Sequence, residues 1–465
     1  MPSIPPQLSH LRRSLLPSAD SSSAGARRDG RQNVTWVEGV RGVASFFVVV
    51  THLCRAWDYS LWFPRDSEDA APRLLQLPFL RLPWQGRIGV TMFAFLTGYV
   101  CAIKPLRQAK SGNTSAALST LAKSAFRRPP RLILPSTIAI LVAWFFAQIG
   151  GFTVAHRCDS EWLRTSSPQD IGSLDTEIPR LFRQLQRNWV ENHNDYDDHQ
   201  WALEPLLRGA FMIYVVLFAT MYMKNKFRTF TLLVLLCWHW LDYTGFVETF
   251  ALQFLYGVLL CDMGSEPWFR DLCARWPNTR RAVQTLLILL GIYVAGYPLE
   301  RPEWSTWSSQ LQWLGTYIFP PDADWPRRWT AVGWDMAVTG IWLSPTLQSM
   351  FSNGMFMWLG RNSFAVYLTH GTVLRVFAAR LIYGWSGQPY SVEKDEKGED
   401  VYHYIPRPGT GVFMIAIPVF FLVEYTIASL WTTYVDAWCA RLTKSLEDAV
   451  FDNEEEGEKR GMQFA

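Results

Sequence analysis

The sequence predicts an all-α fold, a polytopic transmembrane bundle of about ten helices. The 465-residue chain is 49% hydrophobic and 15% aromatic. Its apolar runs recur at close to the length that crosses a bilayer. Mean hydropathy is only +0.01, because polar loops and tails dilute these runs. The predicted spans are 36–56, 87–104, 132–152, 207–223, 229–244, 247–263, 280–297, 331–347, 355–381 and 410–434.

A polar tail flanks the predicted membrane domain (36–434) at each end. Residues 1–35 are rich in Ser, Pro, Ala and Arg and contain no apolar run of signal-peptide type, which predicts a disordered tail. The first span then serves as the insertion signal. Residues 435–465 are predicted to form an acidic tail. The seven cysteines contain no CxxC pair, so we expect neither a disulfide framework nor a metal site.

Loop charges predict how the bundle is oriented. Basic residues gather in the first tail and in the loops after the second and fourth spans, which lie on one side if the spans alternate. The positive-inside rule then places both termini in the cytoplasm. We therefore expect a multi-pass protein of an endomembrane, such as the endoplasmic reticulum, or of the plasma membrane. The net charge of only +3 argues against a nucleic-acid partner, and nothing indicates an oligomeric state.

The connection 154–206 lies on the opposite, non-cytoplasmic side and is unusually long. It carries several tryptophans and histidines, and long connections with their own apolar residues commonly form folded lids. We predict a partly ordered lid.

The first span carries a polar stripe that is expected to be functional. Arg41 and His52 are eleven residues apart, which is about three helical turns, so they share a face about 16 Å apart along the axis. Ionisable groups within a span are costly and usually face a bundle interior or a water-filled cavity. His52 is a candidate general base, with structural hydrogen bonding as the alternative. Arg41 suits phosphate recognition, or else anchors the helix at the interface.

Three further groups could carry chemistry, and each has a structural alternative. His370 is a second histidine within a span, three residues after Tyr367, and its alternative role is a structural hydrogen bond. Glu204 could orient a histidine or act as a charge at a helix N-terminus beside proline. Three arginines before the third span could clamp a phosphorylated donor or only signal topology. They are Arg127, Arg128 and Arg131.

Together these motifs resemble the acyltransferase type 3 family of membrane proteins, in particular its fungal members. The matching segments are WVEGVRGVASFFVVVTHL, MFAFLTGYVCAIKP, FRRPPRLILP, QWALEPLLRGA, ALQFLYGVLL and WLGRNSFAVYLTHG. Arginine, ten residues, then histidine is the family's most specific signature, and Arg41 and His52 match it. One departure concerns the fourth motif, where the family's glutamate stands five residues after tryptophan. Here Glu204 stands three residues after Trp201, and Leu206 occupies the usual place.

The resemblance implies transfer of an acyl group, commonly acetyl, from acyl-coenzyme A to a hydroxyl of a small molecule such as a secondary metabolite, or of a carbohydrate. It implies catalytic roles for His52, Glu204 and His370, and donor binding by Arg41, Arg127, Arg128 and Arg131. Acyl-CoA would be a co-substrate, with no bound cofactor, and membrane lipid would surround the chain. The alternative from another class is a transporter or lipid-handling protein with a buried His/Arg proton relay.

Overall fold

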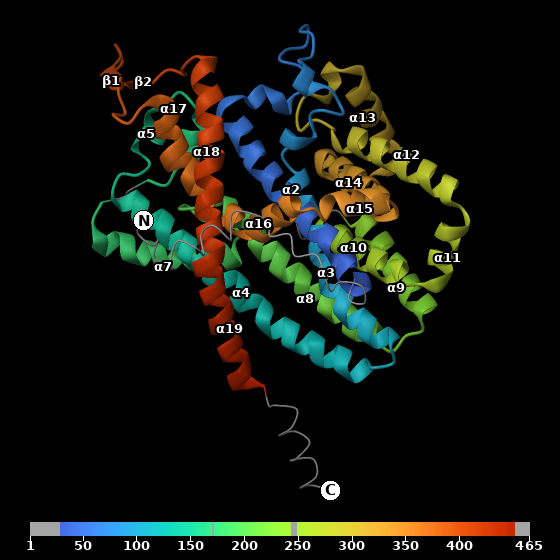
Figure 1. Ribbon diagram of the computed structural model, residues 1–465. Helices are drawn as coiled ribbons and strands as arrows, with labels where there is room; N and C mark the ends of the chain where they lie inside the picture. Colours follow the sequence, from blue (N-terminus) through green and yellow to red (C-terminus); the bar gives the residue numbers. More distant parts are fainter. Residues whose placement is uncertain (1–27, 170–171, 243–248, 452–465) are drawn as a thin grey trace, which may run out of the picture.

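The computed structural model describes residues 28–169, 172–242 and 249–451, with side chains from Thr35 onward. Helices dominate this part of the chain, which confirms the all-α prediction (Figure 1). The described strands form a single two-stranded hairpin, β1 (Ser391–Lys394) with β2 (Asp400–His403). Most of the predicted first tail lies outside the described residues, and the first described helix begins at Arg28.

Each of the ten predicted spans coincides with a described helix. These helices are α2 (Arg28–Trp57), α3 (Ile88–Lys110), α4 (Thr114–Gln148), α8 (Leu203–Thr220), α9 (Asn225–Leu241), α10 (Phe250–Gly264), α12 (Pro277–Ala295), α14 (Trp325–Leu343), α16 (Gly354–Val373) and α18 (Thr410–Trp431).

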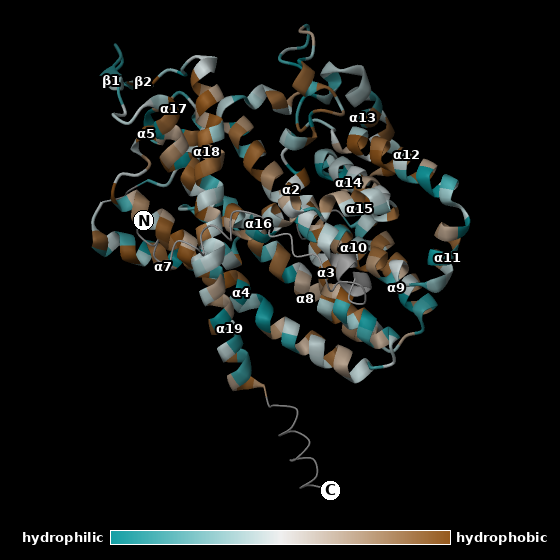
Figure 2. Cartoon of the chain, viewed as in Figure 1, coloured by the Kyte–Doolittle hydropathy of each residue, from teal (hydrophilic) through white to brown (hydrophobic). Residues whose placement is uncertain are grey.

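Five segments of the described chain are long and apolar enough to cross a membrane, so the count of about ten spans is not confirmed. They are Thr35–Trp57, Ile88–Lys110, Thr114–Gln148, Asp198–Thr220 and Thr410–Val450. The last segment comprises α18, a π-helical turn and α19 (Ala437–Val450), which run as one long rod in Figure 1. Figure 2 shows α18 mostly apolar, whereas the β1–β2 hairpin is polar. These features make the chain a membrane protein.

The connection 154–206 is folded, as predicted for a lid. It forms α5 (Thr153–Arg157), α6 (Glu161–Ser166) and α7 (Leu174–Val190), followed by a 3₁₀ turn, Asp198–Ala202. α11 (Pro267–Arg275), α13 (Thr306–Ile318), α15 (Pro345–Phe351) and α17 (Ala379–Tyr383) complete the described helices.

The close packing of α2 against α16 places the site. A Cβ atom on Gly360 would overlap the carbonyl oxygen of Glu38, so only glycine permits this approach. Asn353 caps the N-terminus of α16, where its side chain accepts a hydrogen bond from the Phe356 backbone N–H at 3.0 Å. Ten residues beyond Gly42 and Gly360, which are in contact, the two helices bring His52 and His370 together.

A second glycine contact joins α3 to α10. A Cβ atom on Gly98 would overlap the backbone of Phe254, so glycine permits the close approach of these two helices. α4 contains Pro129, Pro130 and Pro135, which remove backbone hydrogen bonds but are tolerated in membrane helices.

Candidate active site

Three histidines from separate parts of the chain meet in the bundle. His52 (α2), His199 (the turn before α8) and His370 (α16) each offer a ring nitrogen, and these nitrogens lie within 4.8 Å of one another. Ring centroids are 4.2 Å apart for His52 and His199, and 4.8 Å apart for His199 and His370. Three imidazoles at this spacing can either bind a metal ion or exchange protons. They are called the histidine cluster below.

Contacts from the lid and from α16 hold this cluster in place. Trp162 of α6 stacks on His52, with ring centroids 5.5 Å apart. The Tyr367 hydroxyl donates to the carbonyl oxygen of His199, which ties the turn before α8 to α16. The 154–206 connection therefore contributes both a cluster member and its aromatic cover.

A buried ion pair lies directly behind His199. The Nη2 atom of Arg375 is 3.1 Å from Asp197 Oδ1 and 2.9 Å from His199 Nδ1. Asp197 Oδ1 is itself 3.2 Å from the same imidazole nitrogen. Arg375 lies in the π-helical turn Leu374–Ala378, and such turns often occur at functional sites. Both charged side chains are almost completely buried.

One cavity, the histidine cavity, opens beside His52. It has a volume of about 400 Å³ and combines aromatic with charged side chains. In its wall, burial together with a 2.7 Å hydrogen bond to Glu300 raises the pKa of Tyr59 to about 12, so this phenol stays protonated. The lining residues are Val48, Thr51, His52, Arg55, Tyr59, Trp62, Gly86, Arg87, Val90, Thr91, Trp201, Thr249, Phe250, Leu299, Glu300 and Arg327.

A second cavity, the arginine cavity, contains the Arg41 end of the same stripe. Its volume is about 450 Å³, and four arginines but one carboxylate, that of Asp436, contribute to its wall. The arginines are Arg41, Arg128, Arg131 and Arg361. Such an excess of guanidinium groups is suited to an anion with several phosphates. The wall also contains Val37, Val90, Phe93, Leu96, Thr97, Val100, Leu132, Pro135, Ala202, Leu203, Leu206, Ser363, Phe364, Tyr367, Cys439 and Ala440.

The two cavities meet at Val90, which lines both of them. α2 passes both, contributing Arg41 to one and His52 to the other. The spacing in the first span predicted that both side chains share a face of the helix, and the structure adds that they line two different cavities.

The predicted arginine motif divides between two environments. Arg128 and Arg131 line the arginine cavity, and Arg128 Nη2 is 3.5 Å from the hydroxyl of Thr97, which is in the same wall. Arg127 points elsewhere, with its Nε atom 3.5 Å from Glu447 Oε2 on α19. Donor binding by Arg127 therefore remains a prediction that its contacts do not favour.

Glu204 is engaged by a neighbour on its own helix. Its Oε1 atom accepts a hydrogen bond from Arg208 Nε at 2.7 Å, one turn further along α8. The adjacent Leu203 and Leu206 line the arginine cavity instead. The contacts of Glu204 thus favour a charge at the helix N-terminus over a partner for the histidines.

Glu204→Gln is accordingly expected to lower kcat by less than about tenfold, well short of the loss expected for a missing general base. Arg208→Gln is the matched control, because it breaks the same ion pair from the other side and should have a similar, small effect. The measurement is kcat for acyl transfer by purified protein. A Glu204→Gln variant as inactive as His52→Ala would make the displaced glutamate catalytic after all.

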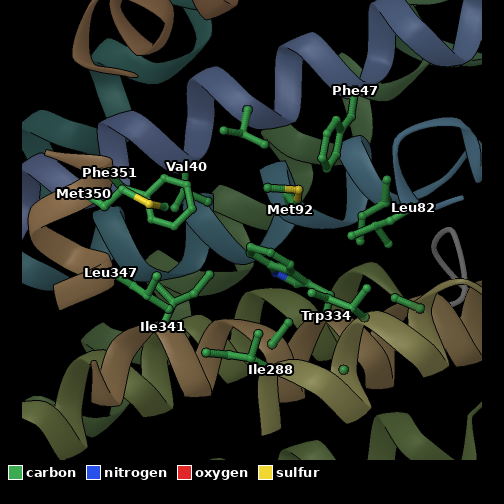
Figure 3. Close-up of a pocket in the computed structure, with 16 residues that line it drawn as sticks. Val40, Phe47, Leu82, Met92, Ile288, Trp334, Ile341, Leu347, Met350 and Phe351 are labelled. Carbon is green, nitrogen blue, oxygen red and sulfur yellow. The ribbon is translucent and has the colours of Figure 1, made fainter. Parts of the chain in front are cut away.

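A third cavity is entirely apolar and lies on another face of α2 (Figure 3). It has a volume of about 210 Å³, between α2, α3, α12, α14 and α15. Figure 3 shows Phe47 and Met92 at one side, with Trp334 and Ile288 facing them. Its lining contains no group that could transfer a proton, so it is separate from the chemistry of the other two.

Sequence reasoning did not single out His199, Asp197, Arg375 or Arg361. Weak signals existed for the first three. His199 lies two residues before Trp201 of the fourth motif, with Asp197 two residues earlier, and Arg375 follows His370 by five. An intramembrane arginine is itself a functional signal, which could have drawn attention to Arg375.

Known proteins are similar to this chain in sequence. A family model described as an acyltransferase domain matches residues 34–435. The chain is 24% identical to the O-acetyltransferase PaAT-1 of Phomopsis amygdali over 385 residues, covering 75% of this chain and 74% of that protein. It is 21% identical to the acyltransferase clz18 of Cochliobolus lunatus over 415 residues, covering 75% and 84%. No solved structure gives a significant match.

The fold and the match together define a membrane-embedded enzyme that transfers acyl groups. The chain belongs to the acyltransferase type 3 family, which confirms the resemblance noted in its motifs.

Proposed function

We propose that this enzyme moves an acyl group, most simply acetyl, from acyl-coenzyme A to a hydroxyl of a small molecule such as a secondary metabolite, or of a carbohydrate. One observation carries the proposal. A cavity rich in arginine and a cavity containing a histidine meet at Val90, and a single helix supplies a key residue to each.

The arginine cavity supports a phosphorylated donor. Coenzyme A carries several phosphates at one end and its thioester at the end of an extended arm. Arg41, Arg128 and Arg131 would bind the phosphates, and the arm would follow α2 for the roughly 16 Å that separates Arg41 from His52. The thioester would then lie near the junction of the two cavities.

The histidine cavity supports a hydroxylated acceptor with an apolar body. Trp62, Trp201 and Phe250 offer flat surfaces for such a molecule, and His52 faces the same space. His52 would take the hydroxyl proton as the oxygen attacks the thioester carbonyl. The C–O bond forms, the C–S bond breaks, and the proton passes to the leaving thiolate, so that an ester and free coenzyme A result.

The relatives support the same chemistry. PaAT-1 is named an O-acetyltransferase, which is a transfer of acetyl to oxygen. The acceptor of the present enzyme can be identified from the metabolites that accumulate when the enzyme is absent.

A deletion strain tests the proposal. Loss of the enzyme should leave an unacylated hydroxyl compound in the culture extract, detected as a mass lower by one acyl group. Purified full-length protein with acetyl-CoA and that extract should restore the higher mass and release free thiol. A strain with an unchanged metabolite profile, together with no thiol release above the protein-free control, would refute O-acyl transfer from acetyl-CoA.

Glycosylation provides a test of the proposed orientation, in which both termini are cytoplasmic. The sequons Asn33-Val34-Thr35 and Asn113-Thr114-Ser115 then face the cytoplasm and should carry no glycan. Asn113 also caps α4, accepting from the Ala116 backbone N–H at 3.0 Å. A sequon engineered into the polar 395–399 turn between β1 and β2 should be modified instead, shown by a mobility shift that a glycosidase removes. Glycan on Asn113 would invert the proposed orientation.

A further inference from the structure

The protonation pattern of the histidine cluster can be derived from its neighbours. Among the described residues, three buried ring nitrogens of the cluster have no hydrogen-bond partner: His52 Nδ1, His199 Nε2 and His370 Nε2. A metal ion would require a bare nitrogen on each ligand. A proton-transfer cluster requires at least one of them to carry hydrogen.

Arg375 determines which ring nitrogen of His199 carries the proton. A guanidinium group has only donors, so the 2.9 Å contact from Arg375 Nη2 requires a bare Nδ1 on His199. In the neutral imidazole the proton then sits on Nε2, toward the cluster. The Nε atom of Arg375 donates to the Gly371 carbonyl at 2.9 Å and Nη1 donates to that of Ser166, so the guanidinium is fixed from several sides.

Asp197 would favour the opposite tautomer, since its carboxylate would accept a hydrogen from Nδ1. Its Oδ1 atom already accepts from Arg375 at 3.1 Å, and its contact with His199 is longer, at 3.2 Å. A metal ion on Nε2 would also place a dication across the ring from this buried guanidinium, which is unfavourable at such short range.

His370 has the complementary arrangement. Its Nδ1 atom is 2.9 Å from the carbonyl oxygen of Val366, which can only accept, so Nδ1 carries the proton and Nε2 is bare. Between them, His199 and His370 therefore offer the cluster one N–H, on His199, and one acceptor nitrogen, on His370.

We infer that Arg375 is a positioning residue, which fixes the tautomer of His199 and keeps the histidine cluster a proton-transfer site rather than a metal site. The inference rests on the proposed function. When His52 takes the hydroxyl proton, the bare nitrogen of His370, in a cluster whose ring nitrogens lie within 4.8 Å of one another, would stabilise the imidazolium electrostatically until the proton reaches the thiolate. A metal ion would occupy that nitrogen and remove the acceptor.

Metal content and kinetics of full-length protein test the inference together. Zinc chloride is added to detergent-purified protein, excess is removed by dialysis, and bound zinc is counted by mass spectrometry. Wild type should hold well under one zinc per chain. Arg375→Met, which has similar length but no donor, should approach one zinc per chain and lose about 10²-fold in kcat, with KM for acetyl-CoA changed less than about threefold. Adding His199→Ala should abolish the gained zinc.

Arg375→Lys supplies the matched control, because an ammonium also donates to His199 Nδ1. It should remain zinc-free and keep kcat within about tenfold of wild type. A purely structural role would instead make both substitutions reduce the amount of folded protein, measured by gel filtration, without any gain of zinc.

The inference would be overturned if active wild-type protein holds one zinc per chain and a chelator removes the zinc and the activity together. This outcome can be measured even if the Arg375→Met variant does not fold. An Arg375→Met variant with wild-type kcat would also overturn the inference. A wild-type protein that never consumes acetyl-CoA would refute the proposed function alone, since the zinc count still decides the state of the cluster.

Discussion

Replacing His52 with alanine is expected to lower kcat for acyl transfer by about 10²–10⁴-fold, the usual cost of losing a general base. The reason is geometric, since His52 belongs to the histidine cluster and also lines the histidine cavity. The measurement is thiol release from acetyl-CoA with the deletion-strain extract as acceptor, checked by the mass of the product.

His403→Ala is a suitable control, because this histidine lies on the exposed strand β2, away from the cavities. It should leave kcat unchanged, and both variants should reach the membrane in wild-type amounts. An activity for His52→Ala within about threefold of wild type would exclude the general-base role.

Arg41→Lys is expected to raise KM for acetyl-CoA by about tenfold, with kcat within about threefold of wild type. Lysine keeps the charge but loses the planar, forked arrangement of donors that suits phosphate. Arg41 is held in the wall of the arginine cavity by an ion pair with Glu38 and a 3.4 Å contact with the Gly360 carbonyl.

Arg107→Lys is the matched control for this prediction. Arg107 is an exposed arginine near the end of α3 that does not contribute to the arginine cavity. Its substitution should leave both constants unchanged. If Arg41→Lys raises KM for the acceptor and leaves that for acetyl-CoA unaltered, Arg41 does not bind the donor.

The sequence predicted best where the signal is local. Arg41 and His52 lie on one helix, so helical periodicity alone predicted a polar stripe with both side chains on it. That the two residues line different cavities depends on the packing of other helices and could not be predicted from the spacing. Arg127 and Arg128 show the limit of that reasoning. Adjacent residues on a helix point about 100° apart, and only the packing of α4 against α19 reveals which one faces the cavity.

The cluster itself depends on contacts between distant segments. His199 reaches His52 because the lid folds back over α2. Arg375 contacts His199 from a π-helical turn, a local geometry that a hydropathy pattern does not predict. The span count is not confirmed, for a related reason. α14 was predicted to be a span, but it contains Arg328 and Asp335. Such a helix is buried because it packs against neighbouring helices, and not because it forms a long apolar run.

Val90 forms a partition between two compartments of one enzyme, because its side chain belongs to both walls. Protein interiors are close-packed, so a change in its size acts on both volumes at once. A smaller residue there would enlarge both cavities, and a larger one would narrow both. At this position the fit of the acceptor in the histidine cavity cannot be changed independently of the fit of the acyl donor in the arginine cavity. Selection for a bulkier acceptor through residue 90 would therefore bring a correlated change in the acyl chains that the enzyme accommodates.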